Sequence, residues 1–152
     1  MAISKGDKAP NFSLEKSDGT PFVLEEALKT NVVVLFFYPK DDTPICTAEA
    51  CAFRDSHEAF LDKGAMVVGI SSDDKDSHES FAKKHGLPYV LLSDIGDKVR
   101  KAYGATSMMG LVPGRVTYVI DQQGIVQMAF SSQLSSTGHM EKALETVASL
   151  SK

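Results

Sequence analysis

The chain has 152 residues, of which 43% are hydrophobic and 24% charged, with a formal net charge of −4 at pH 7. These values fit one globular domain over residues 1–152, large enough to fold without a disulfide or metal. The weak negative charge gives no reason to expect nucleic acid or an anionic membrane as a partner, and the most apolar run, Val32 to Tyr38, is too short to cross a bilayer.

Seven segments are predicted to be strands, because they are short, apolar and bounded by polar residues or by Gly and Pro. The first two flank Ser17-Asp18-Gly19-Thr20 and the last two flank Asp121-Gln122-Gln123-Gly124, so each pair is expected to form a hairpin. In chain order the seven are Asn11–Glu15, Phe22–Leu24, Val32–Tyr38, Ala65–Ser71, Tyr89–Ser93, Val116–Ile120 and Ile125–Phe130.

Helices are predicted between and after the strands, at Thr47–Lys63, Ser77–His85, Lys98–Tyr103 and Met140–Leu150. The first three end immediately before a glycine, which is the common residue after a helix C-terminus. Strands that alternate with helices and close with a hairpin and a helix indicate the α/β class. We therefore expect a central mixed sheet flanked by helices, with a β-hairpin near the N-terminus.

The segment from Phe36 to Glu49 is the most informative part of the chain. A buried strand is expected to end there, the chain turns through Pro39 to Pro44, and a helix begins close to Cys46. Unpaired N–H groups and the helix macrodipole favour negative charge in a first helical turn, which predicts that Cys46 reacts as a thiolate. A thiol of ordinary pKa is about 3% ionised at pH 7, so ionisation alone gains about 30-fold.

Fast reaction of a thiolate with a peroxide also needs donors for the charge that develops on the departing oxygen. Thr43, three residues before Cys46, can direct a hydroxyl toward the sulfur or the substrate. Arg115 stands at the start of a predicted strand and offers several donors in one plane. Other interpretations stay open: Arg115 could pair with a surface carboxylate, Thr43 could be only a turn or capping residue, and Glu49 could only complement the helix N-terminus.

Cys51 follows Cys46 by five residues. Residues five apart in an intact helix have Cα atoms about 8.6 Å apart and point about 140° from each other, whereas a disulfide needs Cα atoms within about 7 Å. Cys46 is expected on the apolar face with Ala50 and Phe53, and Cys51 on the polar side near Arg54. A bond between the cysteines therefore requires the first turn to unwind. Alternatively, Cys51 is only a small buried hydrophobe.

Other residues that could bear chemistry have simpler interpretations. The two cysteines and His57 lack a convincing fourth ligand, so no zinc site is expected. The four histidines, at 57, 78, 85 and 139, read as ordinary surface or boundary residues. Met108-Met109 is read as loop packing rather than a substrate surface. A thiol–disulfide oxidoreductase would prefer a Cys-x-x-Cys pair, and four residues intervene here. A non-catalytic redox sensor or holdase remains an alternative.

These motifs resemble those of the peroxiredoxins, and among them the peroxiredoxin Q or bacterioferritin comigratory type, over nearly the whole chain. The pattern Pro-x-x-x-Thr-x-x-Cys together with an Arg is highly specific, and a Cys five residues later marks the subgroup. Ile45 departs from the Gly that is common in the subgroup. The matching segments are Gly6 to Phe12, Phe37-Tyr38-Pro39, Thr43 to Thr47, Phe53-Arg54-Asp55, Leu91 to Asp94 and Pro113-Gly114-Arg115.

The resemblance implies a thioredoxin-like fold and a role for each matching residue. It implies that Cys46 is the peroxidatic cysteine, that Thr43 and Arg115 activate it and that Pro39 shields the site. It also places Glu49 at an acidic position of the subgroup and makes Cys51 the resolving cysteine.

The implied activity is a thioredoxin-dependent peroxidase of the atypical 2-Cys type. It would reduce hydrogen peroxide and organic hydroperoxides through a Cys46 sulfenic acid that Cys51 resolves as an intramolecular disulfide. Thioredoxin or a related dithiol protein would recycle the enzyme. We expect no cofactor or metal and a monomer. The location would be cytoplasmic for a prokaryotic protein or the chloroplast for a processed plastid form.

Overall fold

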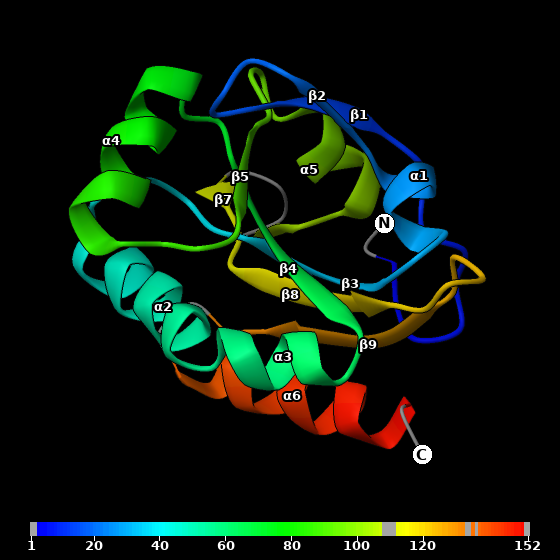
Figure 1. Ribbon diagram of the computed structural model, residues 1–152. Helices are drawn as coiled ribbons and strands as arrows, with labels where there is room; N and C mark the ends of the chain where they lie inside the picture. Colours follow the sequence, from blue (N-terminus) through cyan, green and yellow to red (C-terminus); the bar gives the residue numbers. More distant parts are fainter. Residues whose placement is uncertain (1–2, 108–111, 133–134, 136, 151–152) are drawn as a thin grey trace.

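A computed structural model describes residues 3–107, 112–132, 135 and 137–150, so that Met108 and Met109 lie outside the described residues. A seven-stranded mixed sheet with strand order β2-β1-β5-β4-β3-β8-β9 forms its centre (Figure 1). The strands of this sheet are β1 (Ser13–Lys16), β2 (Pro21–Val23), β3 (Val32–Phe37), β4 (Ala65–Ser71), β5 (Val90–Ser93), β8 (Val116–Ile120) and β9 (Val126–Ser131).

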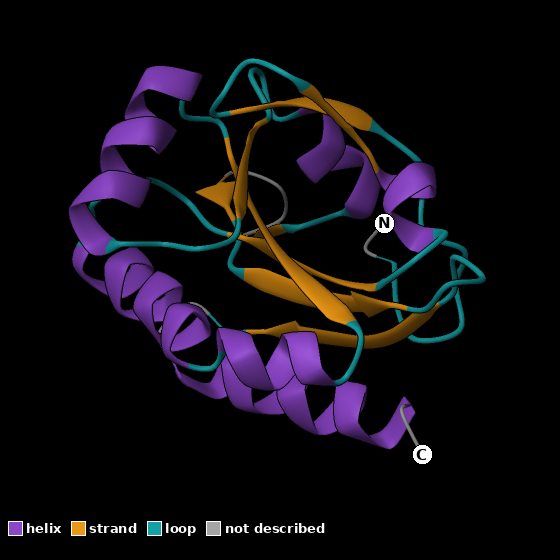
Figure 2. Cartoon of the chain, in the orientation of Figure 1, coloured by secondary structure: helices purple, strands orange, loops and turns teal. Residues whose placement is uncertain are grey.

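Helices cover both faces of the sheet (Figure 2). On one side lie α2 (Pro44–Asp55), α3 (His57–Asp62), α4 (Lys75–His85) and α6 (Thr137–Leu150); on the other lie α1 (Leu24–Leu28) and α5 (Lys98–Tyr103). No helix in the described part of the chain is long and apolar enough to cross a membrane.

Strand β3 divides its side chains between the two cores, as the twofold alternation of a strand requires. Val33, Leu35 and Phe37 face the core that α1 and α5 cover. Val34 and Phe36 face the core beneath α2, α3, α4 and α6, together with Tyr38 just beyond the strand. A continuous apolar run is thus explained by burial on both faces of the sheet.

The predicted α/β class, mixed sheet and N-terminal hairpin are confirmed, with β1 and β2 pairing antiparallel. Local details differ: α4 and α6 begin earlier than predicted, at Lys75 and Thr137. The predicted helix over Thr47–Lys63 starts earlier, at Pro44, and breaks at Ser56, whose φ of −105° and ψ of 7° leave the helical region. Leu24 begins α1 instead of ending a strand. A small second sheet pairs β6 (Thr106–Ser107) with β7 (Val112–Pro113).

Strand register brings two distant segments together. β3 runs antiparallel to β8, and Phe37 at the end of β3 pairs with Val116 at the start of β8. Arg115, immediately before β8, therefore lies beside the loop that leaves β3 and leads to α2. This pairing accounts for how a residue 69 positions along the chain approaches Cys46.

Candidate active site

Cys46 is the third residue of α2, which begins at Pro44. Proline suits the first helical position because its missing N–H would have no helical partner there. The Cys46 side chain is buried, with 1% exposure, and packs in the core that contains Ala50 and Phe53. Its thiol is free. The predicted placement in the first turn, on the apolar face, is therefore confirmed.

Arg115 brings two acceptors together through one nitrogen. Its Nη1 donates to Cys46 Sγ at 3.3 Å and to Glu49 Oε1 at 2.7 Å. The residue is only 5% exposed, so the alternative that Arg115 pairs with a surface carboxylate is wrong. Burial lowers the pKa of Arg115, but Glu49 and Cys46 outweigh it and the net shift is upward. The guanidinium is thus a permanent positive charge beside the sulfur.

Glu49 lies one turn after Cys46 and is completely buried. Burial raises its pKa to about 8, although the neighbouring Arg115 acts in the opposite direction. Its second oxygen, Oε2, lies 3.5 Å from His139 Nδ1 and has no hydrogen-bond partner among the described residues. An oxygen without a partner is costly for a buried carboxylate but less so for a protonated acid.

His139, at the start of α6, approaches Glu49 from the other side. Its Nε2 lies 2.9 Å from the Ser132 carbonyl, which can only accept, so Nε2 carries a hydrogen. Its Nδ1 lies 2.8 Å from Thr117 Oγ1, which can donate to it. Burial lowers the pKa of His139. The ring is therefore neutral and adds no second cation to the site.

Thr43 and Pro39 lie in the loop between β3 and α2, and both are half-buried. The Thr43 hydroxyl donates to the Lys40 carbonyl at 3.0 Å, which ties the turn immediately before α2. Its oxygen retains lone pairs for a further donor. This bond supports the alternative that Thr43 orders the turn. The action of Thr43 on the sulfur and the shielding by Pro39 stay predictions.

Cys51 is partly exposed, also as a free thiol, on the same unbroken helix as Cys46. Two contacts fasten this part of α2 to its surroundings. The Tyr89 hydroxyl donates to the Ala50 carbonyl at 2.6 Å, and Arg54 Nη1 donates to the His85 carbonyl at 2.7 Å. The described state is thus the one in which helix spacing keeps the two sulfurs apart.

The expectation of surface or boundary positions is wrong for two of the four histidines. His78 and His139 are fully buried, not surface or boundary residues. The available signal was helical spacing: His78 precedes Phe81 by three residues, and His139 precedes Ala143 by four, so each shares a face with a buried apolar residue.

One group of possible metal ligands comprises Asp41, Asp73 and His78, whose ligand atoms lie within 4.8 Å of one another. These atoms are already engaged in hydrogen bonds. His78 Nδ1 lies 2.8 Å from Asp41 Oδ2, and Asp73 Oδ2 accepts from the Asp41 backbone N–H at 2.7 Å. The group is therefore a hydrogen-bond network that joins α4 to the loop before α2.

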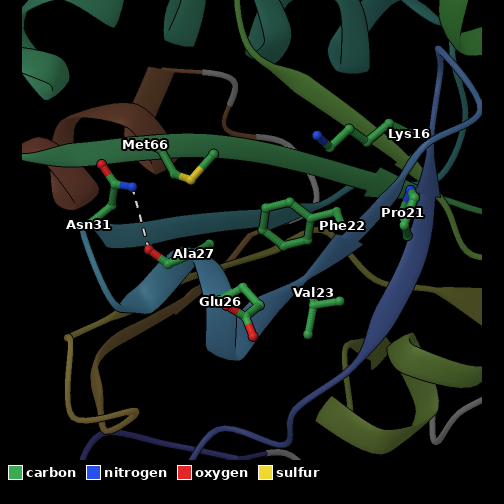
Figure 3. A pocket seen from close by; sticks show the side chains of 8 residues that line it. All are labelled: Lys16, Pro21, Phe22, Val23, Glu26, Ala27, Asn31 and Met66. Atoms are coloured by element: carbon green, nitrogen blue, oxygen red, sulfur yellow. Dashed lines mark hydrogen bonds between the residues drawn. The ribbon is translucent and has the colours of Figure 1, made fainter.

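A shallow hollow of about 320 Å³ lies elsewhere on the molecule, lined by residues of β1, β2, α1 and β4 (Figure 3). Met66 on its wall pairs with Val33 at the start of β3, whereas Cys46 follows the end of that strand. Asn31 Nδ2 donates to the Ala27 carbonyl at 3.4 Å within it. The hollow holds neither cysteine, and the chemistry of the chain is concentrated at Cys46 instead.

Known proteins match most of the chain. Residues 5–129 match the AhpC/TSA family. "Peroxiredoxin Q, chloroplastic" of Sedum lineare is 48% identical over 149 residues, which cover 97% of this chain and 80% of that protein.

Solved structures give close matches as well. Peroxidoxin BcpB of Mycobacterium tuberculosis superposes with a TM-score of 0.91 at 39% identity, covering 97% of this chain and 98% of that one. A bacterioferritin comigratory protein of Xanthomonas campestris, described for its alkyl peroxide reduction activity, matches with a TM-score of 0.87 at 28% identity over the whole of both chains. The expected thioredoxin-like fold is confirmed.

Proposed function

The chain belongs to the AhpC/TSA family and, within it, to the peroxiredoxin Q group of thiol peroxidases, and from this premise we propose how its residues divide the work. Cys46 reduces hydrogen peroxide and organic hydroperoxides, Cys51 resolves the oxidised sulfur as an intramolecular disulfide, and thioredoxin or a related dithiol protein recycles the enzyme. The alkyl peroxide activity named for the Xanthomonas campestris relative supports organic hydroperoxides as substrates.

The observation that carries the proposal is the shared nitrogen of Arg115, which donates to both the buried Cys46 sulfur and Glu49. One buried cation can balance one anion. If Cys46 and Glu49 were both ionised, the site would hold a net negative charge away from water, which is unfavourable. The raised pKa of Glu49, about 8, matches a site in which Cys46 is the thiolate and Glu49 keeps its proton at neutral pH.

The first chemical step follows from this charge balance. The Cys46 thiolate attacks one peroxide oxygen, the O–O bond breaks, and the sulfur becomes a neutral sulfenic acid. The departing hydroxide or alkoxide takes a proton, which we assign to Glu49. Arg115 then pairs with the Glu49 carboxylate instead of the thiolate. Positive charge held in place before the reaction lowers the barrier, because no reorganisation is needed as charge moves.

The resolving step requires motion. The Cys51 thiol attacks the sulfenic sulfur and forms the disulfide with release of water, but only after the start of α2 unwinds. Oxidation favours this motion, since the neutral sulfenic acid no longer attracts Arg115 as a thiolate does. A dithiol partner then reduces the disulfide by exchange and becomes a disulfide itself. Its two hydrogens restore the Cys51 thiol and the Glu49 proton.

Further properties complete the proposal. We propose one domain over residues 1–152 that acts as a monomer, without a cofactor. Only three large apolar side chains of the described residues are exposed, Leu61, Ile95 and Leu150, which supports a monomer. The chloroplastic relatives support a plastid location for a processed plastid form. For a prokaryotic protein we propose the cytoplasm.

The decisive experiment measures peroxide consumption at steady state with thioredoxin, glutaredoxin and glutathione as alternative reductants. The wild type should consume many equivalents of peroxide, and Cys46→Ser should consume none. In Cys51→Ser, dimedone should label residue 46 after one addition of peroxide. Substantial turnover by Cys46→Ser would refute the assignment of the nucleophile. A single equivalent consumed, whatever the reductant, would favour the redox sensor instead.

A further inference from the structure

The loop between β3 and α2 is fastened by Asp41. The Asp41 carboxylate accepts from the Tyr38 hydroxyl at 2.5 Å through Oδ1 and from the Ser77 hydroxyl at 2.8 Å through Oδ2, which also faces His78 Nδ1 at 2.8 Å. Its backbone N–H donates to Asp73. Two of these partners, Ser77 and His78, belong to α4. Asp41 stands three residues before Pro44, the first residue of α2, so its contacts hold the segment that leads into this helix.

The acceptors around the His78 ring indicate where its hydrogens lie. His78 Nε2 lies 2.9 Å from the Leu92 carbonyl, which accepts only, so Nε2 carries a hydrogen. Nδ1 faces a carboxylate oxygen, so a second hydrogen lies between Nδ1 and Asp41 Oδ2. The pair therefore shares a short hydrogen bond between an imidazole and a carboxyl group, inside the protein. His78 is 0% exposed and Asp41 is buried, so solvent does not compete with it.

Resting on the proposed function, we propose that the Asp41–His78 pair is a positioning lock for the reactive cysteine. It holds the loop of Pro39 and Thr43 and the first turn of α2 in the geometry that reacts with peroxide, and it slows the unwinding that must precede the Cys46–Cys51 disulfide. His78 and Asp41 act through the backbone of this loop and touch neither substrate nor sulfur, which makes them positioning residues.

The neighbouring acid, Asp42, shows by contrast why burial matters. Asp42 also reaches α4, where Lys84 Nζ donates to it at 3.0 Å. The Asp42 side chain is 52% exposed and the Lys84 side chain 60%. Exposed ion pairs contribute little, because water and salt screen them. Both acids thus contact the same helix from the same loop, yet only the Asp41 contact is shielded enough to act as the lock.

The lock predicts opposite effects on two successive steps. Weakening it misplaces the loop and should slow the oxidation of Cys46 about 10-fold or more, since small displacements of reacting groups are costly. The same change should accelerate disulfide formation about 10-fold, because one strong restraint on unwinding is gone. Faster resolution leaves less sulfenic acid for further oxidation, so less Cys46 sulfinic acid should accumulate at high peroxide.

Two amide substitutions at His78 separate the contact of its ring with Asp41 from the contact with the Leu92 carbonyl. His78→Asn places an amide N–H near the position of Nδ1 and keeps a donor for Asp41, whereas His78→Gln reaches toward the Leu92 carbonyl and leaves Asp41 without it. Asp42→Asn is the matched control on the same loop. Quenched-flow oxidation, followed by alkylation of free thiols and mass spectrometry, gives the rates of Cys46 oxidation and 46–51 disulfide formation separately.

We expect His78→Gln to slow Cys46 oxidation and to accelerate formation of the 46–51 disulfide. His78→Asn should keep both rates close to those of the wild type, and Asp42→Asn should match the wild type. Equal rates in His78→Gln and wild type, or two rates that fall together, would overturn the lock. If His78→Gln does not fold, Ser77→Ala removes one hydrogen bond to Asp41. This variant should also slow Cys46 oxidation and accelerate disulfide formation, by smaller factors than His78→Gln. Unchanged rates in Ser77→Ala would equally overturn the lock.

The same measurements test the proposed function separately. A wild type in which Cys46 is not oxidised, or in which no 46–51 disulfide forms, would refute the proposed function and the lock with it. A wild type that completes the cycle, beside a His78→Gln protein that completes it at the same two rates, would refute the lock alone.

Discussion

Replacing Glu49 with Gln tests the charge balance of the site most directly. Glutamine keeps the shape of the side chain and an oxygen to accept from Arg115, but it cannot ionise. In the wild type the pKa of Glu49 is raised from the ordinary 4.5 to about 8 by burial. Between these two values the folded protein holds a proton that the unfolded chain has released.

The sign and size of the effect on stability follow by linkage. The folded state binds more protons, so the contribution of Glu49 is complete below its ordinary pKa of 4.5 and is lost as pH rises toward 8. The free energy of unfolding should therefore fall by about 3 kcal/mol between pH 5 and pH 7.5 from this group alone. His139, whose pKa is lowered, acts with the opposite slope below its ordinary 6.5, but it is present in both proteins and cancels in the difference.

Urea unfolding of the reduced proteins at a series of pH values measures this difference. The stability of wild type relative to Glu49→Gln should decline by about 3 kcal/mol across the range. Glu141→Gln, an exposed substitution on α6, is the control and should follow the wild type. Parallel curves for wild type and Glu49→Gln would refute the view that Glu49 is protonated in the folded site at neutral pH.

Three further results are expected. Arg115→Lys keeps a positive charge but loses the planar donor set, so the rate constant with peroxide should fall about 100-fold in stopped-flow assays; an unchanged rate would remove Arg115 from the chemistry. Oxidation should raise amide hydrogen exchange over residues 48–54 while the sheet stays protected, with a 46–51 linkage inside one chain on mass spectrometry; equal exchange, or a bond between two chains, would exclude Cys51 as the resolving residue. Phe53→Ala, which removes a fully buried ring stacked 4.6 Å from that of Phe36, should cost about 3–5 kcal/mol in urea unfolding; a loss below 1 kcal/mol would contradict the packing of α2.

Much of the architecture was predictable because it depends on local patterns. Apolar runs between Gly, Pro and polar residues located all the strands of the main sheet to within two residues, and glycines marked three helix ends. The position of Cys46 at a helix start followed from a buried strand, two prolines and the helix beyond them. The motif around Thr43 and Cys46, with Arg115, was specific enough to identify the family before any geometry was known.

Other features depend on contacts between segments far apart in the chain, and only tertiary structure decided them. Nothing local distinguishes an Arg115 that pairs on the surface from one that bridges Cys46 and Glu49. The antiparallel register of β3 and β8 places Arg115 beside the loop that leads to Cys46, and so decides between the two. The break at Ser56 likewise could not be read from the sequence, because helical periodicity continues through it; beyond the break, Phe60 of α3 still packs in the core.

Ionisable residues show most clearly what the sequence alone could not predict. His78, His139 and Glu49 are common surface residue types, and their charge state depends on solvent exclusion and on which acceptors face them. Those acceptors, the Leu92 and Ser132 carbonyls among them, come from other strands and loops. The sequence by itself determined which atoms are available for chemistry. Folding decided which are buried, which are paired and where each proton lies, because desolvation and hydrogen bonding act through space and not along the chain.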